Sequence, residues 1–288
     1  MPIEFFNASD GIVHVRQSFD SPTVYLDHWA IRLFSDDHNL QDRFVKALMS
    51  KNGTLLLSNF SFTEFSEASD PRHCSDAEKF LERLLPNIFL TDSAIDKALE
   101  RELNEPNNVK RFWPSADLPQ LKLFAEREQS APLGFTMHGF VMMAHTHRVV
   151  LSEVTKNTIQ MVREAFEDAR KDLSYVAKTR NLQPSDNRPR THIIFGELLR
   201  GFILDSQAPI TENDVMDMFH AVISVNCCDY VLLDGPWMER VEKMNQRIAK
   251  TSINMPIAKC FTHRSNGVEA FLTDLETFVK PEKSSAVP

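Results

Sequence analysis

Short apolar runs alternate with amphipathic segments in the first third of the chain. The run at 23–26 is β-prone and stops at Asp27, and the run at 54–57 is apolar throughout. A strand that is apolar on both faces is typical of a parallel sheet covered by helices. A third short run lies at 87–90, and helical spacing links these runs at 29–34, 40–49, 58–68 and 75–85. This alternation predicts an α/β fold with a central parallel sheet.

The middle of the chain has a different pattern. From about residue 91 to residue 200 there is almost no strand signal, and one long helix is predicted at 152–178. The alternation then returns, with helices at 211–225, 238–249 and 268–278 and strands at 230–233 and 257–261. We therefore expect residues 1–90 and 206–288 to form one core, and residues 91–205 to form a large α-helical insertion.

Composition and charge narrow the functional classes. The chain has 288 residues, 42% hydrophobic and 25% charged, which is typical of a globular protein. A net charge of −8 argues against a protein that coats nucleic acid nonspecifically, although a nuclease with clustered carboxylates remains compatible with it. The four cysteines form no CxxC pair, so neither a zinc site nor a disulfide framework is indicated. The sequence shows no secretory signal and no membrane span, and we expect a cytoplasmic protein without membrane contact.

Four acidic residues stand where a parallel sheet binds ligands. Asp27 and Asp234 end two strands, Glu64 lies in the first turns of the helix after another, and Asp217 lies on the helix that leads to Asp234. Carboxyl ends of parallel strands form the ligand crevice of such sheets. Four acids gathered there would repel each other unless a cation neutralised them, and oxygen ligands favour Mg²⁺ or Mn²⁺. The chemistry that needs this arrangement is metal-assisted phosphoryl transfer.

Each acid also has a structural explanation. Glu64 closes a capping-box pattern with the serine three residues before it. Asp27 and Asp234 are candidate helix N-caps, and Asp217 has a place on a solvent-facing side of its helix. His220, one turn after Asp217, either supports a metal ligand or is simply half-buried. The joint order of the four acids along the chain favours a shared site.

That order resembles the PIN-domain ribonucleases, the fold of many bacterial toxin nucleases. The stretch at 24–27 is similar to the family's first strand with its terminal Asp, and the stretch at 57–64 to its second strand followed by a Ser and a Glu. The stretches at 217–222 and 228–234 are similar to the family's Asp-bearing helix and the strand that ends on Asp. His28 stands where family members commonly carry a small hydroxyl residue, and the predicted insertion accounts for the long separation of the two halves.

The resemblance implies a three-layer PIN-like fold and a metal-dependent endoribonuclease that hydrolyses RNA phosphodiester bonds. Asp27, Glu64, Asp217 and Asp234 would be its catalytic residues and the ligands of Mg²⁺ or Mn²⁺. The partner would be an RNA substrate. Such proteins are often toxins held by an antitoxin or host-defence nucleases, so an antitoxin, another protein partner or a second copy of the chain is compatible with this interpretation.

Two other functions remain open from the sequence. The first is a non-catalytic PIN-like scaffold that binds a protein partner through the helical insertion, whose apolar stretch at 140–144 would be either core or partner surface. The second is a metal-dependent phosphatase or DNA nuclease that uses the same acids. A local excess of basic residues either follows an RNA backbone or is a solvated helix end and loop; it comprises Arg170, Lys171, Lys178, Arg180, Arg188 and Arg190.

Overall fold

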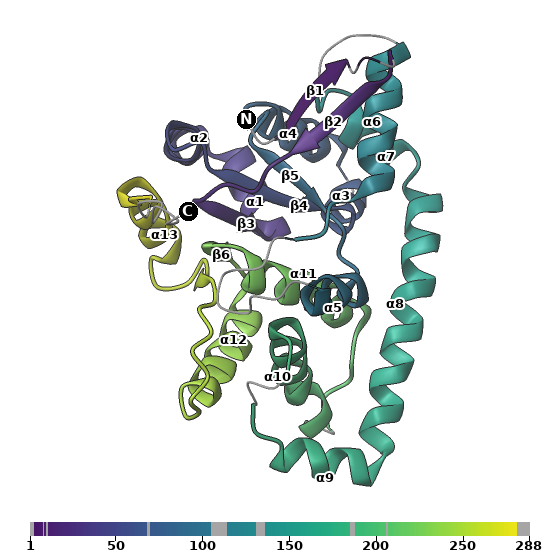
Figure 1. Cartoon of the computed structure of the whole chain (residues 1–288), viewed down its shortest axis with the longest axis vertical. Helices are drawn as coiled ribbons and strands as arrows, with labels where there is room; N and C mark the ends of the chain where they lie inside the picture. Colours follow the sequence, from purple (N-terminus) through teal and green to yellow (C-terminus); the bar gives the residue numbers. More distant parts are fainter. Residues whose placement is uncertain are drawn as a thin grey trace.

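A computed structural model describes residues 3–7, 9, 11–67, 70–104, 114–130, 136–184, 188–205 and 207–280 (Figure 1). The strands in these ranges are β1 (Ile3–Asn7), β2 (Val13–Gln17), β3 (Thr23–Leu26), β4 (Thr54–Ser58), β5 (Ile88–Thr91), β6 (Tyr230–Leu232) and β7 (Lys259–Phe261). The helices are α1 (His28–Asp36), α2 (His38–Ser50), α3 (Asn59–Ser66), α4 (Pro71–Glu82), α5 (Ile95–Asn104), α6 (Leu118–Ser130), α7 (Phe140–Thr146), α8 (Arg148–Lys171), α9 (Leu173–Asn181), α10 (Arg190–Leu204), α11 (Glu212–Cys227), α12 (Gly235–Ile248) and α13 (Gly267–Thr277).

Five strands form one parallel sheet in the order β5-β4-β3-β6-β7. The chain enters the sheet at its centre, moves outward through β4 to β5, and then returns to add β6 and β7 on the other side of β3. Thr23 is tied to the start of β6, because its N–H and hydroxyl both donate to the Asp229 carboxylate, at 2.7 and 2.9 Å. The predicted α/β fold with a central parallel sheet is confirmed. Its topological switch point lies between β3 and β6, where such sheets bind ligands.

Helices cover both faces of this sheet. Side chains alternate between the faces along each strand, so Val24 and Leu26 join one core while Tyr25 joins the other. The first core is filled by α1, α2, α4 and α13, and its centre includes Phe34 and Phe44, whose rings stack 5.0 Å apart. The second core is filled mainly by α10, α11 and α12. Burial on both sides explains why the strand at 54–57 is apolar throughout.

The helical middle of the chain joins both cores. Ile95 on α5, Phe166 on α8 and Leu198 on α10 are buried in the same core as Val231 of β6. Figure 1 shows α8 along one side of the molecule, with α9 at its end. Although α8 has 24 residues, no helix in the described ranges is apolar enough over a sufficient length to cross a membrane.

The predicted single helix at 152–178 is wrong, because the structure divides it between α8 and α9. Asp172 separates the two helices. Its carboxylate accepts hydrogen bonds from the N–H groups of Ser174 and Tyr175, at 2.8 and 3.1 Å, and so begins a new helix. The sequence pattern did not indicate this break, because the residues on both sides of Asp172 have helical spacing.

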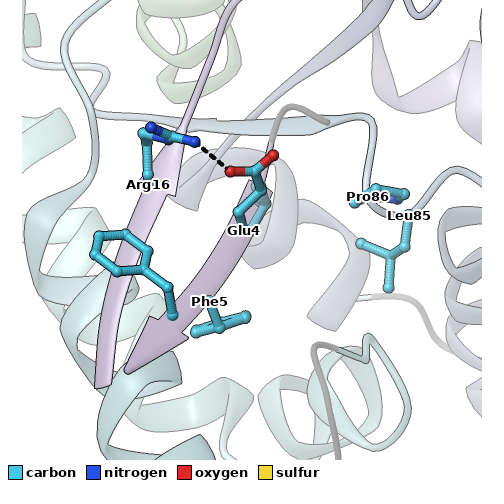
Figure 2. A pocket seen from close by; sticks show the side chains of 7 residues that line it. Glu4, Phe5, Arg16, Leu85 and Pro86 are labelled. Carbon is cyan, nitrogen blue, oxygen red and sulfur yellow. Dashed lines mark hydrogen bonds and ion pairs between the residues drawn. The ribbon is translucent and has the colours of Figure 1, made fainter. Parts of the chain in front are cut away.

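The antiparallel hairpin of β1 and β2 is an addition to the predicted elements. Its strands include exposed polar positions such as His14 and Arg16, so they lack a strong apolar signal. Gln17 attaches the hairpin to β5 through hydrogen bonds to the backbone of Leu90, at 2.9 and 3.1 Å. A cavity of about 700 Å³ lies between the hairpin and the residues just before β5. Figure 2 shows the side chains that line it, with the Glu4–Arg16 ion pair among them. None of the four predicted acids lines this cavity.

Candidate active site at the carboxyl end of the sheet

Asp27 and Asp234 follow the two strands that flank the switch point. The Asp27 N–H donates to the carbonyl of Leu232 at 3.1 Å, which brings Asp27 beside the end of β6. Asp27 begins α1 by accepting the His28 N–H at 2.8 Å, and Asp234 begins α12 by accepting the Trp237 N–H at 2.9 Å. Both predicted N-caps are confirmed. The capping role holds each carboxylate at the sheet edge.

Asp217 reaches this edge from α11. Its Oδ2 accepts a hydrogen bond from the indole Nε1 of Trp237 at 3.0 Å. Trp237 is buried in the first turn of α12, the helix that Asp234 begins. Asp217 therefore does not lie on a freely solvated helix face, and that structural alternative is wrong. Asp214, by contrast, closes the capping box of α11 with Thr211.

Glu64 lies on α3, immediately after β4. The cap of α3 is Ser58, whose hydroxyl accepts the Ser61 N–H at 3.2 Å, and Ser61 closes the box. The capping role considered for Glu64 is therefore wrong. Its Oε2 lies 3.8 Å from Nε2 of His220 on α11. The side chain is thus directed toward the helix that carries Asp217.

His220 and Tyr25 form a buried polar pair behind these acids. The Tyr25 hydroxyl and Nδ1 of His220 are hydrogen-bonded, and both residues are almost fully buried. Burial, with a smaller contribution from His28, lowers the pKa of His220 to about 4, so its imidazole is neutral near pH 7. If Tyr25 donates to Nδ1, the ring hydrogen is on Nε2, which is buried, faces Glu64 and has no hydrogen-bond partner among the described residues. The sequence pattern did not reveal the polar roles of Tyr25 and Trp237.

Burial and mutual repulsion shift three of the acids toward their neutral forms. Burial raises the pKa of Asp27 to about 6, and Asp234 adds to the rise. Burial raises the pKa of Asp217 to about 8, with further contributions from Asp27 and Asp234. The pKa of Glu64 is also raised well above its usual range, by burial and then by Asp27 and Asp217. These mutual effects show that acids far apart in sequence share one environment.

The side chains that the four acids bring together are of the type that binds a divalent cation. Among the described residues, none of the four acids forms an ion pair with a lysine or arginine, and hard oxygen ligands are what Mg²⁺ and Mn²⁺ prefer. Within the described ranges, however, no three His, Cys, Asp or Glu side chains are already positioned to hold an ion. The four acids therefore offer the oxygen ligands that a divalent cation prefers, but within the described ranges they are not already arranged around an ion.

Arg264 is a cation at the start of α12 that the sequence pattern did not reveal. Its guanidinium lies over Gly235, because a Cβ built on Gly235 would stand 2.6 Å from the guanidinium carbon. The group also lies 3.6 Å from Glu239, an exposed and therefore weak ion pair. Glycine at this position lets a positive side chain approach the start of α12.

Part of the predicted basic stretch has an internal role. Arg170 donates to the carbonyls of Phe202 and Ala208, at distances of 2.7–3.0 Å. Arg190 is buried, and its guanidinium donates to Asn226 and to the carbonyl of Pro256. These two cations hold helices together. The alternative that the basic stretch follows an RNA backbone is therefore wrong for the buried Arg190.

The site geometry stands without support from relatives. Comparison of the chain with models of known protein families, with curated proteins and with solved structures found no match.

Proposed function

We propose that the chain is a metal-dependent endoribonuclease with a three-layer PIN-like fold. Its site is Asp27, Glu64, Asp217 and Asp234, which would hold Mg²⁺ or Mn²⁺ and act on an RNA phosphodiester. The observation that carries the proposal is the shared, recessed environment of these acids at the switch point of a parallel sheet. The resemblance of the sequence to PIN-domain ribonucleases suggests that the chain is a toxin or defence nuclease with an antitoxin or other protein partner.

The electrostatics support a cation site rather than a purely structural one. Burying several carboxylates together without positive partners lowers the stability of a fold, because each disfavours ionisation of the others. Burial first, and then this mutual repulsion, raises the pKa values of three of the four acids, Asp27, Glu64 and Asp217. A divalent cation would remove this repulsion and favour the ionised forms.

The residues of the chain would each have a defined task. Bound Mg²⁺ or Mn²⁺ supplies Lewis-acid chemistry, which activates water and stabilises the charge that develops on the phosphate oxygens. Asp27 and Asp234 hold their carboxylates at adjacent strand ends through their capping bonds. The indole of Trp237 orients Asp217, and His220 faces Glu64 from the buried side. No covalent enzyme intermediate is needed.

The proposal predicts Mn²⁺- or Mg²⁺-dependent cleavage of labelled single-stranded RNA by the purified chain. Asp27→Asn and Asp234→Asn each remove one ligand charge, and we expect the cleavage rate to fall by at least about 100-fold, as for other positioned charged groups in catalysis. The measurement is single-turnover cleavage, with EDTA as the metal-free reference. Thermal melting with added Mn²⁺ gives a second readout, because an ion that binds only the folded state raises Tm.

Asp36→Asn is the matched control, since Asp36 is an exposed acid on α1, the helix that Asp27 begins. It should retain wild-type cleavage and wild-type stabilisation by Mn²⁺. The proposal is wrong if Asp27→Asn and Asp234→Asn leave both at the wild-type level. Parallel assays with single-stranded DNA and p-nitrophenyl phosphate separate a ribonuclease from a DNA nuclease or a phosphatase.

A non-catalytic scaffold is a second candidate, favoured by exposed apolar side chains at the start of α8. Val149 and Val150 are 73% and 63% exposed, and Met143 on α7 is 54% exposed. A run of this kind is typical of a protein-binding surface. If the wild-type chain cleaves none of the three substrates, and if a partner is captured that Val150→Glu fails to capture, the scaffold replaces the nuclease.

A further inference from the structure

A groove of about 530 Å³ lies between α10 and α12 and carries a local excess of positive charge. The two helices lie side by side in Figure 1. The cations that line the groove are Arg200, Arg240, Lys243, Arg247 and Lys250. Three acids also line it, in a chain whose net charge is −8. A concentration of positive charge on an acidic protein marks this groove as a candidate for an anionic ligand.

The three acids of the groove already have partners. Glu197 forms an ion pair with Arg247 at 2.6 Å, and Glu239 lies 3.6 Å from Arg264. Asp205 accepts two backbone N–H groups at 3.3 Å. The groove nevertheless keeps an excess of positive charge, because five cations line it against three acids.

Four cations of the groove have no ion-pair partner in the part of the chain that the structure describes, and one of them, Arg200, donates to the carbonyls of Thr179 and Arg180. Lys243 and Lys250 are exposed. The Arg240 guanidinium lies 4.0 Å from the ring centre of Phe202 and 5.4 Å from that of Trp237, so its orientation is fixed by aromatic contacts rather than by an acid. These charges are available to an external anion.

The cations form a row that leads away from the acid site. Positions 240, 243, 247 and 250 recur every three or four residues, and they share one face of α12 and its C-terminal turn. The row spans about 15 Å, at 1.5 Å per residue. It begins beside Trp237, whose indole binds Asp217 and whose backbone N–H binds Asp234. Trp237 therefore lies between the row of cations and the acid site and contacts both.

We propose that the groove between α10 and α12 binds the phosphate backbone of the RNA strand whose cleaved bond lies at the four acids. This inference rests on the proposed function. A phosphate is repelled by clustered carboxylates, so a strand that reaches them gains from neighbouring phosphates held by lysine and arginine. The groove supplies these contacts without reading base identity, because contacts to phosphates carry no sequence information.

The test is fluorescence-anisotropy binding of labelled single-stranded RNA to the full chain in EDTA, over a salt series. We expect the double variant Lys243→Ala/Lys250→Ala to bind more weakly and to show a slope of log K against log salt that is shallower by about 1.4, from about 0.7 per phosphate contact on a single strand. Lys243→Arg/Lys250→Arg should retain the wild-type slope. The matched control is Lys46→Ala/Lys156→Ala, two exposed lysines on α2 and α8, which should also retain it.

The outcomes separate the groove from the catalytic proposal. If the alanine variant binds RNA with the wild-type affinity and slope, the groove inference is overturned even when the wild type cleaves RNA. If the wild type cleaves nothing but its RNA binding depends on Lys243 and Lys250, the groove stands and the catalytic proposal falls. An equal loss with single-stranded DNA supports contacts to phosphates. Unchanged Tm in the alanine variant shows that the loss is not caused by unfolding.

Discussion

At the residue scale, the fold strongly raises the pKa of Asp217, one of the four acids of the site. Its pKa is raised from 3.8 to about 8, first by burial and then by the neighbouring acids. The folded chain keeps this proton over a pH range in which the unfolded chain releases it. The contribution of Asp217 to stability is therefore fully present below about pH 4 and is lost as the pH rises toward 8.

We predict that Asp217→Asn raises Tm in EDTA at pH 8.5, because it removes a charge that the folded state disfavours. The gain should be on the order of 1 kcal/mol or more, equivalent to about 2 °C or more. At pH 4 the gain should be nearly zero, because Asp217 is then already neutral. Thermal melting across this pH range checks the trend, with Asp36→Asn as the control. A Tm gain that is equal at both pH values would contradict the assigned protonation.

Some residue roles in the site could be predicted from the sequence, and others could not. The N-cap positions of Asp27 and Asp234 followed from strand ends and were predictable. The hydrogen bond between Asp217 and Trp237, and the pairing of Tyr25 with His220, were not. Each joins segments that only tertiary packing brings together, so no local spacing encodes it.

At the scale of elements, the start of α3 sets the place of Glu64. Ser58 is both the last residue of β4 and the N-cap of α3, so no loop separates the two elements. Glu64 therefore lies on the second turn of α3. We predict that Ser58→Ala lowers the free energy of unfolding by about 1 kcal/mol, because the Ser61 N–H loses its acceptor. Urea denaturation measures the change.

The control for Ser58→Ala is Thr273→Ala, an exposed position within α13 that caps no helix. Its effect should stay within about 0.5 kcal/mol. Equal stability of Ser58→Ala and the wild type would show that α3 does not depend on this cap.

Strands with a continuous apolar run were predicted from the sequence. Elements whose hydrophobic pattern is weak or ambiguous were not. The strands β3, β4 and β5 are fully buried and mainly apolar, so their runs stand out. In the hairpin, β2 exposes alternate polar residues and β1 is only partly buried, so neither strand has a strong apolar signal. The division between α8 and α9 depends on a single aspartate within a helix-favouring stretch.

At the scale of the whole molecule, a buried polar network connects the helical middle of the chain to α11. The Glu102 carboxylate on α5 accepts the backbone N–H groups of Arg190 and Thr191 at the start of α10. Arg190 and Thr191 in turn bind Asn226 on α11. The boundaries predicted at 91 and 205 remain a prediction, but the packing across them is extensive.

We predict that Arg190→Met destabilises the entire chain rather than the helical segment alone. Removing the guanidinium leaves buried acceptors of Asn226 and Pro256 without their donor, at a cost of about 3 kcal/mol. Denaturation followed by both tryptophan fluorescence and circular dichroism should give one coincident transition at a lower midpoint. Two separate transitions would show instead that the helical segment unfolds independently.

The pairing of β3 with β6 joins residues 206 positions apart, through the Thr23–Asp229 contact. Contacts of such long sequence separation form late in folding, because the intervening chain must first be ordered. A nascent polypeptide that has left the ribosome only as far as α10 contains Asp27 and Glu64 but neither of their two partners. The four acids of the site can therefore come together only after translation has passed the codon for Asp234.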